Sequence, residues 1–293
     1  ENGAGHRGTL MNYRHAFHAG NIGDVLKHAV LARVITYLKE KPAAFRVIDT
    51  HAGIGRYDLR EGEARRTGEW QNGIARVLKT KQPARVAELL APWLEVVKSL
   101  NADEAELRHY PGSPLLARML LRKQDRLTAT ELHPKDAETL ADLFAGDHQT
   151  KAIALDGWLA VGSFVPPKER RGLVLIDPPF ESQDEFSTLA AGLVKAWKRW
   201  PTGVYMAWYP IKDRKMVNSF YSVMRNQEIG RIMCVEHFAG AAHPDKPMMG
   251  SGLIMINPPW TLADELRVLM PWLTETMALG PGADWRLIPL TGE

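Results

Sequence analysis

Short apolar runs that alternate with longer helical patterns are the feature that most constrains this fold. Each run spans about four to eight residues and ends in a turn or a polar residue. That order is typical of a parallel sheet covered by helices, so we predict an α/β fold. Seven strands are predicted, near residues 46–49, 126–130, 152–155, 173–176, 204–208, 232–238 and 253–256.

The connection between the last two predicted strands, residues 239–251, is rich in Gly, Pro and Met and has no helical period. A link without a crossover helix favours an antiparallel pair at the edge of the sheet. A mostly parallel sheet that ends in a reversed strand is the architecture of the Rossmann-like class I methyltransferase fold. Fold alone does not determine function, so the site residues must be argued separately.

A helical insertion is predicted between the first two strands. About 75 residues separate them, whereas a simple crossover needs only about 30. The helical spacing within this gap indicates a small subdomain over residues 60–107, inserted into a main domain of residues 11–59 and 108–293. Residues 1–10 have no apolar period and are interpreted as a remnant of expression or processing.

The composition is that of a folded globular protein. The chain has 293 residues, of which 45% are hydrophobic, and a net charge of only +3. It contains no run of 18 apolar residues and no secretory signal pattern, which argues against membrane insertion and export and favours the cytoplasm. The single cysteine, Cys234, cannot form an internal disulfide, and its apolar neighbours indicate a core residue.

A glycine turn follows the first predicted strand, in Asp49-Thr50-His51-Ala52-Gly53-Ile54-Gly55. Glycines let a ligand approach the backbone, and ligands of open α/β sheets bind beyond the carboxyl ends of the strands. Asp58 replaces the third glycine of a dinucleotide motif, and the Asp49 carboxylate would repel a phosphate. The Asp49 carboxylate suits instead the cationic groups of S-adenosylmethionine. The alternative interpretation of this segment is an ordinary glycine turn after a strand.

Acidic residues end the next two predicted strands as well. Glu131 is suited to accept hydrogens from ribose hydroxyls, and Asp156 from an adenine amine. One acid at a strand end is common, but three on successive strands at one edge indicate an S-adenosylmethionine pocket.

The segment Asp177-Pro178-Pro179-Phe180 follows the fourth predicted strand and carries the chemistry. The exocyclic amine of adenine is a poor nucleophile. The Asp177 carboxylate and the Pro178 carbonyl can accept both amine hydrogens and turn the lone pair toward a sulfonium methyl for in-line transfer. Phe180 offers a flat face to a base that has left its stack. The alternative is a rigid surface turn.

A second copy of this pattern, Asn257-Pro258-Pro259-Trp260, follows the seventh predicted strand. If that strand is antiparallel, its carboxyl end lies at the opposite edge of the sheet, so we interpret this copy as structural.

The segment before the first helix is dense in polar and aromatic residues. Either Asn21 or Asp24 could cap that helix. Four histidines, His15, His18, His28 and His51, lack the ligand spacing of a zinc site, so no metal is predicted. Basic runs at 65–66, 168–171, 195–199 and 212–215 are interpreted as solvated faces unless they bind phosphates, in which case affinity should fall steeply with salt.

Several of these motifs in combination resemble the large-subunit ribosomal RNA adenine-N6 methyltransferase J family. The resemblance runs from Met11 nearly to the end of the chain. Its motifs are Tyr13-Arg14-His15 with Lys27-His28, Asp49-Thr50-His51-Ala52-Gly53, Tyr110-Pro111-Gly112-Ser113-Pro114, Thr130-Glu131-Leu132-His133-Pro134 and Asp177-Pro178-Pro179. It implies a monomeric enzyme with a helical insertion that methylates an adenine of protein-free 23S ribosomal RNA.

The resemblance also implies roles for individual residues. Asp177 would be catalytic, Tyr13 would meet the incoming adenine, and Phe180 replaces the tyrosine usual in the family. The S-adenosylmethionine site would be lined by Lys27, His28, His51, Ser113, Glu131, Asp156 and Gly157. Lys27 could alternatively be a solvated helix lysine, and Ser113 could cap the following helix.

Three other functions fit the same residues. A DNA adenine-N6 methyltransferase and a protein glutamine methyltransferase act on the same kind of amine, and a non-catalytic RNA-binding module could keep the same fold.

Overall fold

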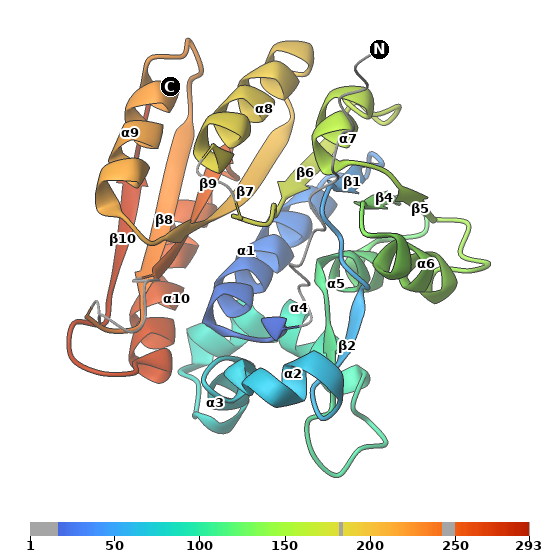
Figure 1. Ribbon diagram of the computed structural model, residues 1–293, viewed down its shortest axis with the longest axis vertical. Helices are drawn as coiled ribbons and strands as arrows, with labels where there is room; N and C mark the ends of the chain where they lie inside the picture. The colour runs from blue at the N-terminus through green and yellow to red at the C-terminus, as the bar shows by residue number, and fades with distance from the viewer. Residues whose placement is uncertain (1–16, 182–183, 242–249, 293) are drawn as a thin grey trace, which may run out of the picture.

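The computed structural model describes residues 17–181, 184–241 and 250–292. Within these residues, one sheet of eight strands forms the centre of the protein, in the order β10-β8-β9-β7-β6-β1-β4-β5 (Figure 1). The strands are β1 (Arg46–Asp49), β4 (Arg126–Glu131), β5 (Thr150–Ala154), β6 (Gly172–Ile176), β7 (Val204–Ile211), β8 (Ile232–Phe238), β9 (Gly250–Ile256) and β10 (Asp284–Pro289).

The sheet is mostly parallel, as the sequence predicts. Strands β5, β4, β1, β6 and β7 run in one direction, and β9 is antiparallel to both β7 and β8. The predicted antiparallel pair is therefore confirmed, but it does not form the edge, because β10 pairs with β8 beyond it. Strand β10 escapes prediction because it is a short, half-exposed strand that ends in Pro289.

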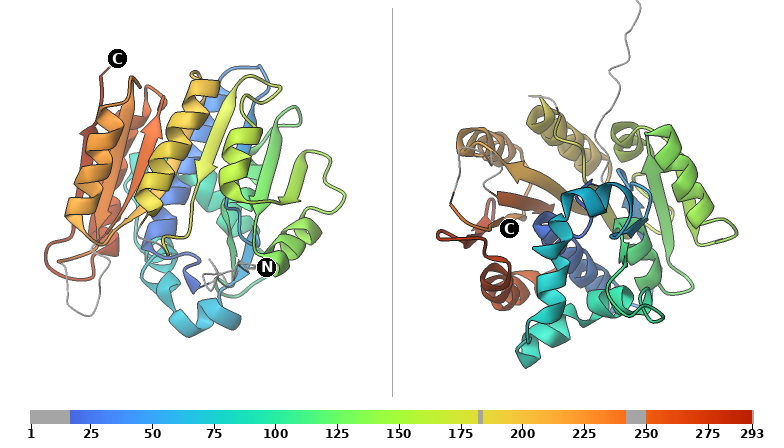
Figure 2. Two further views of the ribbon diagram at one scale, coloured as in Figure 1. Left: turned by 45° about the horizontal axis from the view of Figure 1, so that its top comes forward. Right: turned by 60° about the horizontal axis from the view of Figure 1, so that its bottom comes forward.

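Helices cover both faces of the sheet and make a three-layer fold (Figure 2). One face packs against α1 (Ile22–Lys39), α4 (Ala84–Ser99), α5 (Ser113–Leu120), α6 (Pro134–Leu143) and α10 (Leu262–Met277). The other face packs against α7 (Gly157–Ser163), α8 (Glu185–Arg199) and α9 (Arg214–Arg225). None of the described helices is long and apolar enough to cross a membrane.

Helix α1 is buried on nearly all sides because apolar residues occupy most of its circumference. The Asn21 side chain accepts a hydrogen bond from the Asp24 backbone N–H and so caps the helix, which decides between the two predicted caps. Asp24, Lys27 and His28 are all buried in its first turns. Buried polar groups need partners, and the Lys27 ammonium finds them in the carboxylates of Asp24 and Asp177.

Helices fill most of residues 60–107, between β1 and β4. They are α2 (Gly62–Thr67), the short 3₁₀ helix η2 (Glu69–Gln71), α3 (Ile74–Lys79) and α4. Strands β2 (Arg56–Asp58) and β3 (His109–Pro111) pair antiparallel at the base of this segment, so the chain leaves and returns at one point. The division into a main domain and a subdomain stays a prediction, as does the reading of residues 1–10, which lie outside the described residues.

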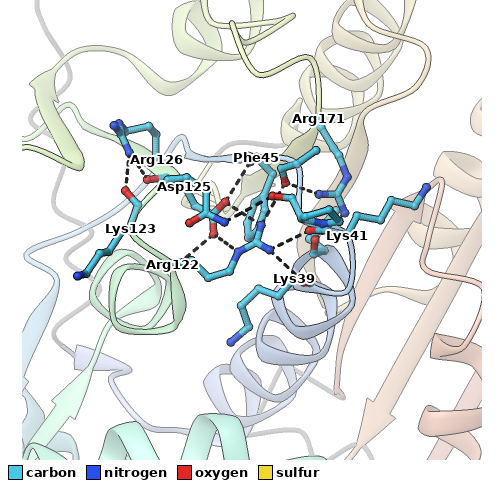
Figure 3. Close-up of polar contacts among 12 residues, drawn as sticks. Lys39, Lys41, Phe45, Arg122, Lys123, Asp125, Arg126 and Arg171 are labelled. Carbon is cyan, nitrogen blue, oxygen red and sulfur yellow. Dashed lines mark hydrogen bonds and ion pairs between the residues drawn. The ribbon is translucent and has the colours of Figure 1, made fainter.

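A polar cluster lies at the amino edge of the sheet, opposite the carboxyl ends of the parallel strands (Figure 3). Arg122 pairs with Asp125 and donates to the carbonyls of Lys39 and Lys41, while Arg171 donates to the carbonyl of Leu38. The last carbonyls of a helix have no partner within it, so these guanidinium groups stabilise the end of α1. They fix the helix at the edge away from the candidate site.

Candidate active site

Four acidic residues come together at the carboxyl edge of the sheet. Asp49, Glu131 and Asp177 stand at the ends of β1, β4 and β6, and Asp156 follows β5. These strands are neighbours, in the order β6-β1-β4-β5, and all four run parallel. The structure thus brings the sequence-predicted acids to one edge, where open α/β sheets bind ligands.

Asp49 is fully buried at the end of β1. The Ser113 hydroxyl donates a hydrogen bond of 2.6 Å to its Oδ2, whereas its Oδ1 has no hydrogen-bond partner among the described residues. Burial raises the pKa of Asp49 to about 7, against the lowering effect of the Ser113 hydrogen bond. Ser113 does not cap its own helix, because Gly112 occupies the cap position.

The glycine turn after β1 is tied to β4 by Glu131. Gly53 has a φ of 60°, and its N–H donates a bond of 2.9 Å to Glu131 Oε2, while His133 N–H donates one of 2.8 Å to Oε1. These bonds fix the carboxylate and still leave lone pairs on both oxygens.

His51 and Gly157 lie against each other beside this turn. A Cβ added to Gly157 would lie 2.4 Å from both His51 Nε2 and the Thr50 carbonyl, so the position has no room for a side chain. Burial lowers the pKa of His51 to about 4, although the negative charges of Asp177 and Asp156 oppose this shift. Asp156 Oδ1 accepts a bond of 2.9 Å from the Leu159 N–H at the start of α7.

Lys27 reaches from α1 to Asp177 and is only 3% exposed. Its Nζ donates to Asp177 Oδ2 and lies 2.8 Å from Asp24 Oδ1. Burial alone would lower the pKa of Lys27, but the attraction of Asp177 and Asp24 raises it above its ordinary value. Lys27 is therefore a buried ammonium group between two carboxylates, and the alternative of a solvated lysine is wrong.

His28 forms the other polar contact of α1. Its Nδ1 is 2.8 Å from the Tyr110 hydroxyl, and the two rings stack with centroids 5.4 Å apart. Both residues are fully buried. This contact joins α1 to β3, at the base of the helical segment.

The loop after β6 carries Asp177 and continues into an aromatic cluster. Pro178 is buried and Phe180 is half-buried. The Phe180 ring makes edge contacts with Phe186, at 5.1 Å between centroids, and with Trp208, at 5.9 Å. Packing against Phe186 and Trp208 therefore holds the Phe180 ring in place, three residues after Asp177.

The second Pro-Pro motif lies at the opposite edge, because β9 is antiparallel to its neighbours. Asn257 donates to the carbonyls of Pro201 and Gly203, which precede β7. Trp260 is 74% exposed. The copy is therefore far from the four acids, as the sequence indicates.

Sequence reasoning missed three residues of this region. Asp24, proposed only as a helix cap, pairs with Lys27. The Tyr110 hydroxyl forms a hydrogen bond with His28, and the rings of Trp158 and His51 make an edge contact with centroids 5.4 Å apart. The spacing of Asp24 and Lys27 on an otherwise apolar helix was the available signal. Tyr13 lies outside the described residues. No group of three or more His, Cys, Asp or Glu suited to a metal occurs in the described part of the chain.

Comparisons with known proteins point to one family. Residues 42–287 match the family model described as ribosomal RNA large subunit methyltransferase D, RlmJ. A ribosomal RNA large subunit methyltransferase J of Haemophilus influenzae is 39% identical over 97% of this chain and 100% of its own length. The protein of that name from Escherichia coli K12 is 42% identical over 90% of this chain and 93% of its own length. A crystal structure of a Legionella pneumophila protein matches with a TM-score of 0.82 and 31% identity, over 93% of this chain and 98% of its own.

Proposed function

We propose that this chain methylates the N6 amine of an adenine in 23S ribosomal RNA. The proposal starts from the family, because the chain belongs to the ribosomal RNA large subunit methyltransferase family described as RlmJ. S-adenosylmethionine would be the methyl donor. The observation that carries the proposal is the Asp177-Pro178-Pro179-Phe180 loop, which stands at the same sheet edge as the buried Asp49 carboxylate and the glycine turn.

The residues of the pocket fit S-adenosylmethionine. Asp49 is a buried carboxylate with one oxygen that has no hydrogen-bond partner among the described residues, so a cationic group is its natural complement. Glu131 would accept from the ribose hydroxyls and Asp156 from the adenine amine of the cofactor, and Gly157 packs against His51 and Thr50, where no side chain fits. Lys27, His28, His51, Gly53 and Ser113 would line the same pocket. The bound cofactor would supply an electrophilic methyl group.

The chain itself would act by holding the substrate amine. The Asp177 carboxylate and the Pro178 carbonyl would accept its two hydrogens, and the proline rings restrict the backbone that presents them. Lys27 would hold the Asp177 side chain in place, because its Nζ is fixed between Asp24 and Asp177. Phe180 would stack on the adenine, a contact worth about 1 to 3 kcal/mol. Catalysis would then come mainly from positioning.

The finer features of the substrate follow from this proposal. Protein-free large-subunit RNA would be the partner, the enzyme would work as a monomer, and a ribosomal RNA substrate would put it in the cytoplasm. Tyr13 would contact the incoming adenine. The rivals are DNA adenine and protein glutamine methylation, or RNA binding without catalysis.

Labelled S-adenosylmethionine offered with RNA, DNA or protein in parallel tests the proposal. We expect methylation of protein-free 23S RNA, with N6-methyladenine found by mass analysis of the digested product. Asp177→Ala should reduce turnover by more than 100-fold, because a missing catalytic acceptor costs about 3 kcal/mol or more. Cofactor affinity should change little. Undiminished methylation by Asp177→Ala, or methylation of DNA or protein instead, would contradict the proposal.

A further inference from the structure

A basic groove between α8 and α9 lies outside the site described above. It has a volume of about 820 Å³ and an apolar floor that includes Phe186, Val194 and Phe220. Lys195, Lys198 and Lys215 line it, and all three are exposed. In the part of the chain that the structure describes, no salt bridge joins these lysines to a carboxylate.

Positive charge is concentrated around this groove. Residues 184–228, which include all of α8 and α9, contain seven Lys and Arg and four acidic residues, Asp184, Glu185, Asp213 and Glu228. This segment therefore carries a net charge of +3, which equals the net charge of the whole chain. Arg214 is neutralised by two bonds of 2.6 and 3.0 Å to the fully buried Glu236, whereas the groove lysines carry uncompensated charge. Such a field attracts a polyanion to this face rather than to the others.

One end of the groove adjoins the candidate active site. Phe186 lines the groove and also contacts Phe180, the last residue of the Asp177-Pro178-Pro179-Phe180 loop. Lys212 Nζ, at the end of β7, lies 3.5 Å from the Phe180 carbonyl. Helix α8 follows the loop that carries Asp177, and α8 and α9 lie side by side on one face of the sheet (Figures 1 and 2). From Phe186 to Lys198 the groove extends about 18 Å along α8, about five nucleotide steps of a duplex.

We infer that the α8–α9 groove binds the phosphate backbone of the RNA strand on one side of the target adenine. The inference rests on the proposed function and adds the surface that holds its substrate. Lys195, Lys198 and Lys215 contact phosphates, and the apolar floor between them contacts sugars and unstacked bases. Lys195 and Lys198 stand one turn apart on α8 and Lys215 stands in the first turn of α9, so the charges come from both helices that form the groove.

Charge removal tests the inference. The triple variant K195Q/K198Q/K215Q is compared with K41Q/K123Q/K151Q, which removes three exposed lysines near the opposite edge of the sheet. Binding of a protein-free 23S RNA transcript is titrated over a range of salt concentrations. Three lost phosphate contacts should reduce the slope of log K against log salt by about 2 and weaken binding about 100-fold at 0.1 M salt. The control triple should keep the wild-type slope.

Two further measurements separate the outcomes. Cofactor affinity of the groove variant should equal that of the wild type, which shows that the fold and the cofactor site are intact. If the wild type methylates RNA but both triples bind it alike, the groove inference fails and the proposed function stands. A change of oligomeric state in the groove variant would assign the groove to a second copy and overturn the inference. If the wild type methylates no RNA, the proposed function itself fails.

Discussion

Removing the Ser113 hydroxyl should shift the pH range in which the protein binds its cofactor. Ser113 Oγ donates to Asp49 Oδ2 at 2.6 Å, and both residues are buried. This bond favours the ionised carboxylate, which burial disfavours, and the pKa of Asp49 is raised to about 7 by the balance. A cationic ligand binds the ionised form, so the contribution of Asp49 to affinity should rise with pH through about 7 and then level off.

The size of the shift follows from the hydrogen bond. A bond to a charged group contributes about 1.5 to 3 kcal/mol, and 1.36 kcal/mol corresponds to one pH unit. Ser113→Ala should therefore raise the pKa of Asp49 by about 1 to 2 pH units. Relative to the wild type, its S-adenosylmethionine affinity should be about 10- to 100-fold lower at pH 6 but within about threefold at pH 9.

Calorimetry of S-adenosylmethionine binding across this pH range checks the prediction. The amine of the ligand titrates identically with both proteins, so the ratio of the two affinities isolates Asp49. Ser251→Ala is the matched control, because Ser251 is a buried serine on β9, separated from β1 by β7 and β6. A wild-type to Ser113→Ala ratio that stays constant with pH would show that ionisation of Asp49 does not govern binding.

Three other substitutions test separate parts of the site. Phe180→Ala should weaken RNA binding by about 1 to 3 kcal/mol with unchanged cofactor affinity, measured by RNA titration, whereas Trp260→Ala in the second Pro-Pro motif should have no effect. Gly157→Ala should lower the free energy of unfolding, measured in urea titrations, by about 1 to 3 kcal/mol, because the added Cβ would lie 2.4 Å from His51 and Thr50. Gly280→Ala should leave the free energy of unfolding unchanged, because no atom beyond its chain neighbours lies within 4 Å of the added Cβ. Glu69→Gln should reduce kcat for RNA methylation more than cofactor affinity; equal losses in both would refute a positioning role.

The sheet and its edge could be predicted because both depend on local patterns. Apolar runs identify β1, β4 and β6, and the residue that ends each run must lie at the carboxyl edge of a parallel sheet. Asp49, Glu131 and Asp177 were found in this way. Strand β10 was not, because a half-exposed edge strand lacks the continuous apolar run that marks a central strand.

The partners of the site residues could not be predicted because they are distant in sequence. Lys27 and Asp177 are separated by 150 positions, and neither neighbourhood carries a signal for the other. Ser113 stands at a helix start, where a cap is the usual role, but Gly112 takes that position and frees the hydroxyl for Asp49. Local preference gives a list of alternatives, and tertiary packing selects among them.

The helical segment between β1 and β4 is connected to the reactive loop through the start of α1. Glu69, in η2, accepts hydrogen bonds of 2.9 Å from both His18 Nδ1 and Asn21 Nδ2. Asn21 caps α1, and about one turn further along the same helix Asp24 pairs with Lys27, whose Nζ also reaches Asp177.

This connection makes the position of Lys27 depend on Glu69. A helix is a rigid element, so a shift of its capped end moves Lys27 Nζ relative to Asp177 by a similar distance. Misplacement of a catalytic group by about 1 Å can cost about 100-fold in rate. Glu69 holds the amino end of α1 through Asn21, and Lys27 lies within two turns of that end. For this reason Glu69→Gln is expected to act on turnover, although Glu69 itself contacts neither Asp49 nor Asp177.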